Sequence, residues 1–404
     1  MQQIFLTRSE MRKAILSILM VILVMSISLP AQDTCSEDYT KAMTANSPSE
    51  KYNLLKAWVA SCSGKGIQYE NFAYAFLCTL QVPGRSVQEI VDFGEKALSF
   101  GGFDDDMKYT ILISVASAYI QLGNNLSKAR DYSGQATKIA TTNKNKGSDA
   151  GDPAIWNQRI GAGHYVQALA FEKEKNLKAA VTAYINSYNI LRNKQIATAL
   201  AKIGQSLYNA KSYADAEKAL KVASTALRDF GTTALYAKCL HRGGKKSEAL
   251  TSYKQAYTKE KNGEIAYNIG LILAGEVQQN GTSANEAIRY LLEASFLSAA
   301  NSKQAMDLAE RLYFNNVDKT FNDKVKLLGD KSKEQENLTN DFNKKFGEKD
   351  EEELTDAERT EMDSMLKKLE AIQGEIEKLQ IEQAASLENW QQQIDQAKQR
   401  LGIK

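Results

Sequence analysis

The stretches AVTAYINS at residues 180–187, AEKALKVA at 216–223 and ALTSYKQA at 249–256 repeat one pattern of residue sizes. Each stretch begins with alanine, has a large residue four positions later and ends on a small residue three positions after that. Residues four and seven positions apart lie on the same side of an α-helix, so each stretch predicts a helix with one patterned face. The opening alanines are 36 and 33 residues apart, which indicates a repeated structural unit.

A second pattern precedes each of these predicted helices. It consists of a small residue and, three positions later, an apolar one: Ala168 and Phe171, Gly204 and Leu207, Ala237 and Leu240. Nine residues separate each apolar position from the alanine that opens the next helix. Two antiparallel helices need small residues where their axes come closest. One pair cannot bury its apolar face alone, so we expect the pairs to stack.

Looser copies of the pattern flank the three tight ones. They are built on Ala129 and Ala136 before them and on Ala287 and Ala294 after them, and an earlier copy ends at Ala97. Ser-x-x-Glu capping boxes at residues 86–89 and 283–286 predict where two of the helices begin.

These residues resemble the tetratricopeptide repeat (TPR) family over roughly residues 105–300, about half of the chain. The tryptophan of that family and the proline that often closes its repeats are missing here. The resemblance implies an all-α fold, an α-solenoid of TPR-like helix pairs. It also implies a right-handed superhelix whose concave groove binds a protein or peptide partner.

The step of 51 residues from Ala129 to Ala180 predicts an insertion. Residues 141–152 (TTNKNKGSDAGD) are polar and contain glycine, so we expect an exposed loop there. Asp152 and Pro153 then fit the N-cap and the first residue of the next helix.

The N-terminus has the pattern of a secretory signal. Arg12 and Lys13 precede an apolar run at residues 14–27, and Ala31 is a small exit residue that fits cleavage. The run is short for a membrane span of roughly 20 residues, although an uncleaved anchor is the alternative. We therefore expect an exported protein, periplasmic or secreted, without stable membrane insertion after cleavage.

Export would permit disulfide bonds, and the chain has four cysteines. Ser47 and Pro48 fit a helix start, which predicts a helical hairpin over residues 35–62 with its turn near Asn46. Cys35 and Cys62 would lie at the adjacent ends of that hairpin, so we predict a disulfide; two unpaired thiols are the alternative. Cys78 and Cys239 lie in apolar helical segments and are expected to be core thiols.

The last part of the chain predicts a long helical hairpin or coiled coil. Apolar residues at steps of three and four run from Met362 to Leu379 and resume from Leu387 to Leu401. This seam either packs on a helix at residues 318–346 in an antiparallel hairpin or lets residues 356–401 self-associate. Equal monomeric masses of the full chain and residues 1–317 in light scattering would exclude self-association.

Four segments follow from these patterns. They are a signal peptide at 1–31, degenerate helical hairpins at 32–104, the TPR-like array at 105–317 and the charged hairpin or coiled coil at 318–404.

Composition and motifs exclude several classes of function. The net charge is +2, which is atypical of a dedicated nucleic-acid binder, so no nucleic-acid partner is expected. The chain has 2 histidines, His164 and His241, and no HExxH, GxSxG or phosphate-binding loop. Three consecutive aspartates at 104–106 lack the spacing of a calcium loop and fit a polar turn. We expect no cofactor, no metal site and no enzymatic activity.

The TPR resemblance implies that the first helix of each pair lines the binding surface. The corresponding candidate partner-binding residues are Tyr165, Gln205, Tyr208, Asn209, Lys238, Arg242 and Tyr267, with Leu169, Glu172 and His241 beside them. Tyrosine and arginine are frequent anchors at protein interfaces, although these tyrosines could also pack between helices. The lysine and asparagine arrangement with which some TPR proteins clamp a terminal carboxylate is not reproduced.

Two functions remain as hypotheses. The first is an exported scaffold that binds a peptide or protein on the concave face of the repeats. The alternative is a structural envelope protein that oligomerises through its C-terminal coiled coil.

Overall fold

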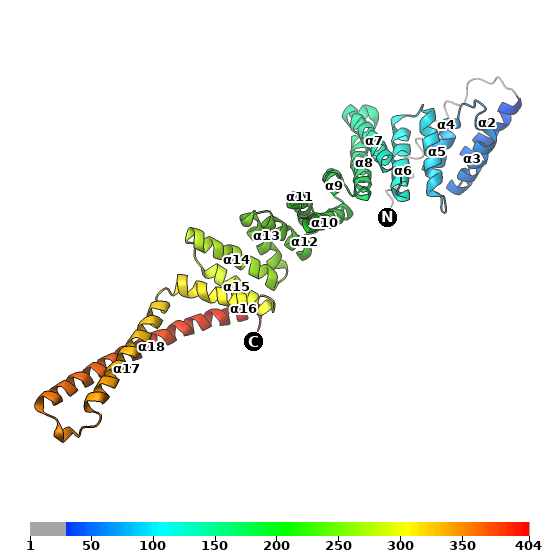
Figure 1. Cartoon of the computed structure of the whole chain (residues 1–404). Helices are drawn as coiled ribbons and strands as arrows, with labels where there is room; N and C mark the ends of the chain where they lie inside the picture. The colour runs from blue at the N-terminus through cyan, green and yellow to red at the C-terminus, as the bar shows by residue number, and fades with distance from the viewer. Residues whose placement is uncertain (1–29, 404) are drawn as a thin grey trace. The chain divides into compact units, whose positions relative to one another are not determined.

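The computed structural model describes residues 30–403, and every regular element among them is a helix (Figure 1). Residues 1–29, which contain nearly all of the predicted signal segment, lie outside the described residues. The chain divides into two compact units, Met1–Asn193 and Lys194–Lys404. The expected all-α fold, a solenoid of TPR-like helix pairs, is confirmed. The four segment limits stay predictions.

The first unit contains the helices that precede residue 194. They are α2 (Pro30–Met43), α3 (Pro48–Cys62), α4 (Glu70–Thr79), α5 (Val87–Phe100), α6 (Asp105–Leu122), α7 (Leu126–Lys146), the short η1 (Gly147–Ala150), α8 (Pro153–Lys173) and α9 (Leu177–Leu191).

The second unit contains three helix pairs and the C-terminal elements. They are α10 (Lys194–Asn209), α11 (Tyr213–Leu227), α12 (Phe230–Arg242), α13 (Lys246–Lys259), α14 (Gly263–Asn280), α15 (Asn285–Leu297), α16 (Ser302–Leu312), the π-helix η2 (Tyr313–Val317), α17 (Phe321–Phe346), η3 (Glu351–Glu353) and α18 (Asp356–Leu401).

The alanines that define the repeat occupy equivalent places. Ala180, Ala216 and Ala249 are each the fourth residue of α9, α11 and α13, and each is fully buried. The backbone N–H of each donates to the carbonyl of the residue that precedes its helix, at 2.9–3.0 Å. The repeat in the sequence therefore corresponds to a repeat in the structure. The helix pairs α8–α9, α10–α11 and α12–α13 are three copies of it.

The turns within these pairs are also equivalent. The backbone N–H groups of Asn176, Ser212 and Lys245 donate back to the carbonyls of Phe171, Leu207 and Leu240, each at 2.9 Å. This is the hydrogen bond of a Schellman helix end, which requires a left-handed residue in the turn. Lys175, Lys211 and Gly244 occupy that position with φ of +61°, +60° and +83°. The fixed spacing of nine residues follows from this shared turn.

Small residues lie where the paired helices come closest, as expected. A Cβ atom on Gly204 would lie 2.6 Å from Cγ of Leu220, and one on Gly270 would lie 2.6 Å from Cγ of Leu291. Protein atoms do not approach this closely without displacement, so these pairs of helices depend on glycine at both positions.

The predicted exposed loop at residues 141–152 is wrong for residues 141–146, which are helical, whereas residues 147–152 form η1 and a short turn that is mostly exposed. Helix α7 continues through Lys146, and only η1 and a short turn separate it from α8. The amide of Asn143 is buried and donates to Asp105 at 2.8 Å and to the carbonyl of Ile139 at 3.1 Å. The hydrogen bond from Asn143 of α7 to Asp105 of α6 thus stabilises the helical form of this polar stretch. Two long helices, α7 and α8, account for the insertion, and Asp152 caps α8 as predicted.

One predicted capping box is also wrong, and the other is confirmed. Ser86 and Glu89 form a complete box at the start of α5. At the predicted box of residues 283–286, the Ser283 hydroxyl accepts only from the N–H of Asn285, at 3.4 Å. The N-cap residue is Ala284, which has a helical backbone conformation. The reason is that α15 begins one residue later than the motif requires, so Glu286 does not lie at its third position.

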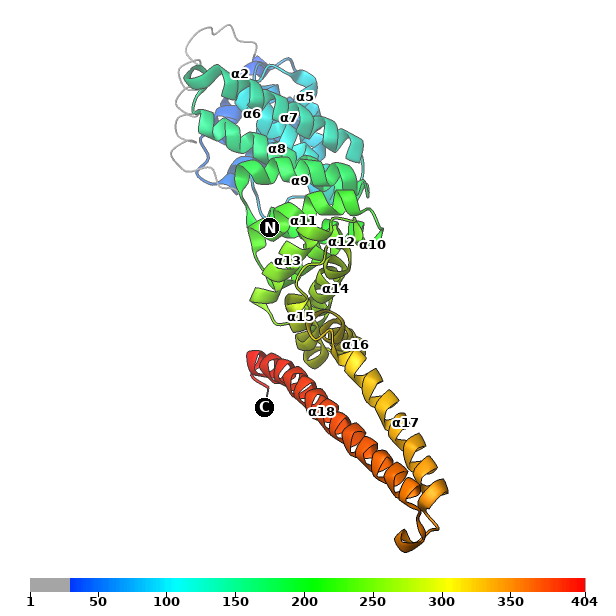
Figure 2. The same cartoon turned by 90° about the vertical axis from the view of Figure 1, so that its left-hand side faces the viewer.

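The C-terminal helices form the predicted antiparallel hairpin, in which α17 and α18 lie side by side in both views (Figures 1 and 2). Lys331 contacts Glu375 at 2.9 Å and Lys349 contacts Glu358 at 2.7 Å. Phe346, Leu354 and Met365 form a small apolar cluster at the far end. Most of the seam is therefore used within one chain, and self-association through residues 356–401 stays a prediction.

The last turns of α18 leave α17 and pack on α15 and η2. Trp390 lies 5.2 Å from the ring of Tyr313, and the Arg400 guanidinium donates to Glu293 at 2.9 Å. Glu293 is 3% exposed and also accepts from Tyr257 at 2.6 Å. The prediction that Leu387 lies on the buried seam is wrong, because it is 45% exposed. The buried side of α18 changes beyond the first residues of α17, where α15 becomes the neighbour of α18.

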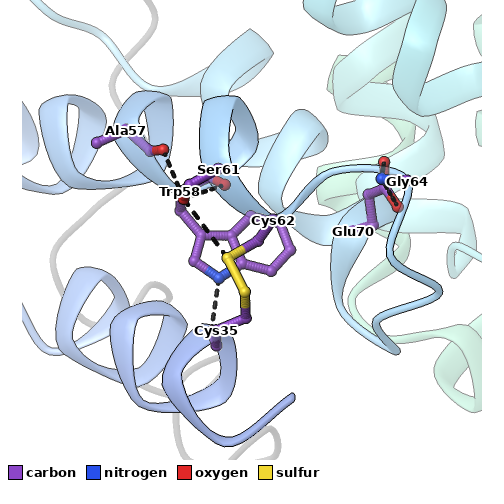
Figure 3. Close-up of a disulfide and its surroundings, with 7 residues drawn as sticks. All are labelled: Cys35, Ala57, Trp58, Ser61, Cys62, Gly64 and Glu70. Carbon is purple, nitrogen blue, oxygen red and sulfur yellow. Dashed lines mark hydrogen bonds between the residues drawn. A yellow bond between two sulfur atoms is a disulfide. The ribbon is translucent and has the colours of Figure 1, made fainter. Parts of the chain in front are cut away.

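The predicted disulfide is present in the first hairpin, where it joins Cys35 of α2 to Cys62 at the end of α3 (Figure 3). The indole N–H of Trp58 donates to the carbonyl of Cys35 at 2.6 Å. The turn that follows is fixed by Glu70, whose carboxylate accepts from the backbone of Gly64 at 3.1 Å. Cys78 and Cys239 are free and buried, as expected of core thiols.

Candidate partner-binding face

The first helices of the three pairs in the second unit present a polar and aromatic surface. We call it the first-helix face, and it consists of Lys202, Gln205, Tyr208, Asn209, Lys238, His241, Arg242, Glu264 and Tyr267. These side chains come from α10, α12 and α14. None of them is fully buried.

The repeat geometry determines which side chains reach this face. Gly204 and Ala237 lie at equivalent positions on the sides of α10 and α12 that meet their second helices. Residues one, four and five positions after them therefore lie at equivalent places as well. In α10 these residues are Gln205, Tyr208 and Asn209, and in α12 they are Lys238, His241 and Arg242.

Capping side chains fix the starts of α12 and α14. Asp229 accepts from the backbone N–H of Thr232 at 2.7 Å, and this hydrogen bond lowers the pKa of Asp229 although its partial burial would raise it. Asn262 accepts from the N–H groups of Glu264 and Ile265 at 3.1 and 3.2 Å. These N-caps stabilise the first turns of the two helices.

Two hydrogen bonds order the polar residues of the face. Lys238 donates to Glu264 at 2.8 Å and so connects α12 with α14. Gln205 donates to Asn209 at 2.9 Å along α10. Glu264 was not predicted as a site residue. Its position three residues before Tyr267, on the same side of one helix, is the sequence signal that could have identified it.

A histidine and a tyrosine meet beneath the exposed residues. The hydroxyl of Tyr253 lies 3.5 Å from Nδ1 of His241, and the two rings are perpendicular with centroids 5.9 Å apart. Burial lowers the pKa of His241, and the charges of Arg242 and Lys246 lower it further. Both effects favour the neutral form of the imidazole. The sequence predicted Tyr253 only as a large core residue and gave no sign of its contact with His241.

The hydroxyl groups divide the tyrosines into two kinds. Tyr184 donates to Glu172 at 2.5 Å and Tyr257 donates to Glu293 at 2.6 Å, so both hold helices together. By contrast, within the described part of the chain the hydroxyls of Tyr208 and Tyr267 have no hydrogen-bond partner. Both residues are half-buried.

Tyr165 belongs to the first unit, whereas the first-helix face is built from helices of the second unit. The ring of Tyr165 lies 6.0 Å from the ring of Tyr184 on α9. The hydroxyl of Tyr184 donates to Glu172, which lies on α8 together with Tyr165. Burial raises the pKa of Tyr165, and the charge of Glu172 adds to the effect. Glu172 is thus engaged in a contact within one helix pair, and Leu169 beside it is half-buried.

The other charged candidates have structural contacts. Asp104 caps α6, Asp105 contacts Lys146 at 3.6 Å, and Asp106 pairs with Arg159 at 2.5 Å. Among residues 30–403 no group of three or more His, Cys, Asp or Glu side chains is placed to hold a metal ion. None of the helices described between residues 30 and 403 combines the length and apolar character needed to span a membrane.

Comparisons with known proteins give structural neighbours only. No protein-family model matches the chain. No curated protein matches it either. Among solved structures, a tetratricopeptide repeat protein from Parabacteroides merdae is 16% identical, with 69% of this chain and 99% of that chain covered and a TM-score of 0.32. The apo form of RapI is 12% identical, with 79% and 99% covered and a TM-score of 0.32.

Proposed function

We propose that this chain is an exported, non-enzymatic scaffold that binds a peptide or protein segment on the first-helix face. The observation that carries the proposal is the set of exposed groups without partners on that face. Tyr208, Arg242 and Tyr267 come from three successive first helices, and their polar groups bond nothing else in the described chain. Tyrosine and arginine in this setting are typical anchors of a protein interface.

Two features support export. The signal pattern of residues 1–31 directs a chain out of the cytoplasm. The disulfide between Cys35 and Cys62 is a bond that persists in oxidising compartments. The mature protein is proposed to act in the periplasm or outside the cell.

Removing the anchors should abolish partner capture. Changing Tyr208, Lys238 and Arg242 together to alanine deletes one aromatic ring and two positive charges from the first-helix face, so we expect the partners retrieved from an envelope extract to be lost. The measurement is a pull-down with the full chain, read by mass spectrometry against the wild type.

A matched control removes charge elsewhere on the same unit. Lys221 is exposed on α11. Lys254 lies on α13 and pairs with Glu286 of α15. Changing both to alanine deletes two positive charges from second helices and should leave the retrieved partners unchanged. If the triple variant retrieves the same partners as the wild type, the first-helix face is not the binding surface.

A further inference from the structure

The first-helix face carries an excess of positive charge that the chain does not neutralise. Its basic residues are Lys202, Lys238 and Arg242, and its acidic residue is Glu264. Glu264 pairs with Lys238 at 2.8 Å. In the described chain no ion pair forms at Lys202 or Arg242, so two cations face solvent on this surface.

Some arginines of the described chain are paired with a carboxylate, whereas Arg242, like Arg228 and Arg311, is not. The guanidinium groups of Arg130, Arg159 and Arg400 each contact a carboxylate at 2.5–3.1 Å. Arg242 lies on α12, the middle of the three first helices, and has no carboxylate partner among residues 30–403. Arg242 and Lys246 both act on the pKa of His241, so a second cation lies near Arg242.

The groups around Arg242 suit a carboxylate ligand with an apolar neighbour. Burial raises the pKa of Tyr253, and the charges of Tyr208, Glu264 and Arg242 also act on it, so these three groups lie around the Tyr253 hydroxyl. Guanidinium binds carboxylates through two parallel hydrogen bonds, and a phenol can add a third. The half-buried rings of Tyr208 and Tyr267 offer apolar surface on either side of α12.

We propose that the segment bound on the first-helix face is an acidic peptide. A side-chain carboxylate of the peptide binds Arg242, and an apolar residue of the peptide packs on the ring of Tyr208 or Tyr267. Lys202 attracts a second carboxylate along α10. This inference rests on the proposed function, because it specifies the chemistry of the partner for the same face.

Selection from charged peptide libraries tests the inference. Three display libraries of 12-residue peptides share the same apolar residues, while their polar positions are drawn from Asp and Glu, from Lys and Arg, or from Ser, Asn and Gln. Panning on the full chain should enrich the acidic library. The strongest acidic clone is then measured by fluorescence anisotropy against three proteins: the wild type, Arg242→Gln and Lys221→Gln.

We expect Arg242→Gln to weaken binding by roughly 10- to 100-fold, since a hydrogen-bonded charge pair is lost. Lys221→Gln removes an equal charge from α11 and should change affinity less than about twofold. Enrichment of neutral or basic peptides overturns the acidic specificity but leaves peptide binding intact. Equal affinities of the two variants also overturn the inference. Failure of all three libraries contradicts the proposed function itself.

Discussion

Leucine in place of Gly270 should destabilise the second unit by about 2–3 kcal/mol. A Cβ at this position would lie 2.6 and 2.7 Å from Cγ and Cδ2 of Leu291 and 3.3 Å from its backbone nitrogen. The backbone of α15 cannot rotate away, so the substitution must separate α14 from α15. Thermal unfolding followed by circular dichroism should show a midpoint about 5–10 °C lower for a unit of this size.

The same helix supplies the control. Gly275 lies five residues further along α14, and a Cβ there would meet no atom within 4 Å. Gly275→Leu should therefore raise stability by up to about 1 kcal/mol, because leucine favours helix more than glycine does. If the two variants unfold at the same temperature, close packing at the small positions does not stabilise the pairs.

Loss of the disulfide should cost the first unit about 3 kcal/mol. Cys35 and Cys62 are separated by 27 residues, and their bond restricts the unfolded chain. Replacing both by alanine should also loosen α2 from α3, because the bond joins the two helices. Trp58 is 2% exposed and bonds the carbonyl of Cys35, so its fluorescence should shift to longer wavelength.

Reduction provides an independent check of the same effect. Dithiothreitol should lower the unfolding temperature of the wild type to that of the double variant and should not change the variant. Trp156 and Trp390 also contribute fluorescence, so a variant with both replaced by phenylalanine isolates the signal of Trp58. Equal unfolding temperatures of wild type and double variant would show that the bond contributes no stability.

The helix pairs were predictable because two simple physical constraints coincide in the sequence. Ala180, Ala216 and Ala249 must be small for the helices to approach, and the turn between the helices has a fixed length. The hairpin of α2 and α3 was predictable from Ser47 and Pro48, which mark a helix start, and Ser47 indeed accepts from Glu50.

The errors arose where tertiary contacts decide local structure. Asn143 lies in a polar stretch that resembles a loop, yet its hydrogen bond to Asp105 on another helix compensates for its low helix propensity. Leu387 continues a heptad seam in the sequence but is exposed, because the partner of α18 changes near that point. Neither contact leaves a pattern that a periodicity search can detect.

The candidate site was predictable in part. The resemblance to the TPR family implied that Gln205, Tyr208, Lys238 and Arg242 lie on one face, and their role in binding stays a prediction. The sequence did not distinguish tyrosines that bond within the chain from those that do not. Tyr184 and Tyr208 both lie in helical repeats, and only the position of Glu172 shows that Tyr184 has a structural partner.

The central claim, that the first helices of the second unit bind a protein partner, is tested most directly by site-specific photo-crosslinking in the native envelope. A photoreactive benzoylphenylalanine replaces either Gln205 on α10 or Lys221 on α11, both of which are exposed. The account predicts a specific crosslinked adduct from position 205 and none from position 221. An adduct that forms from position 221 alone would contradict it.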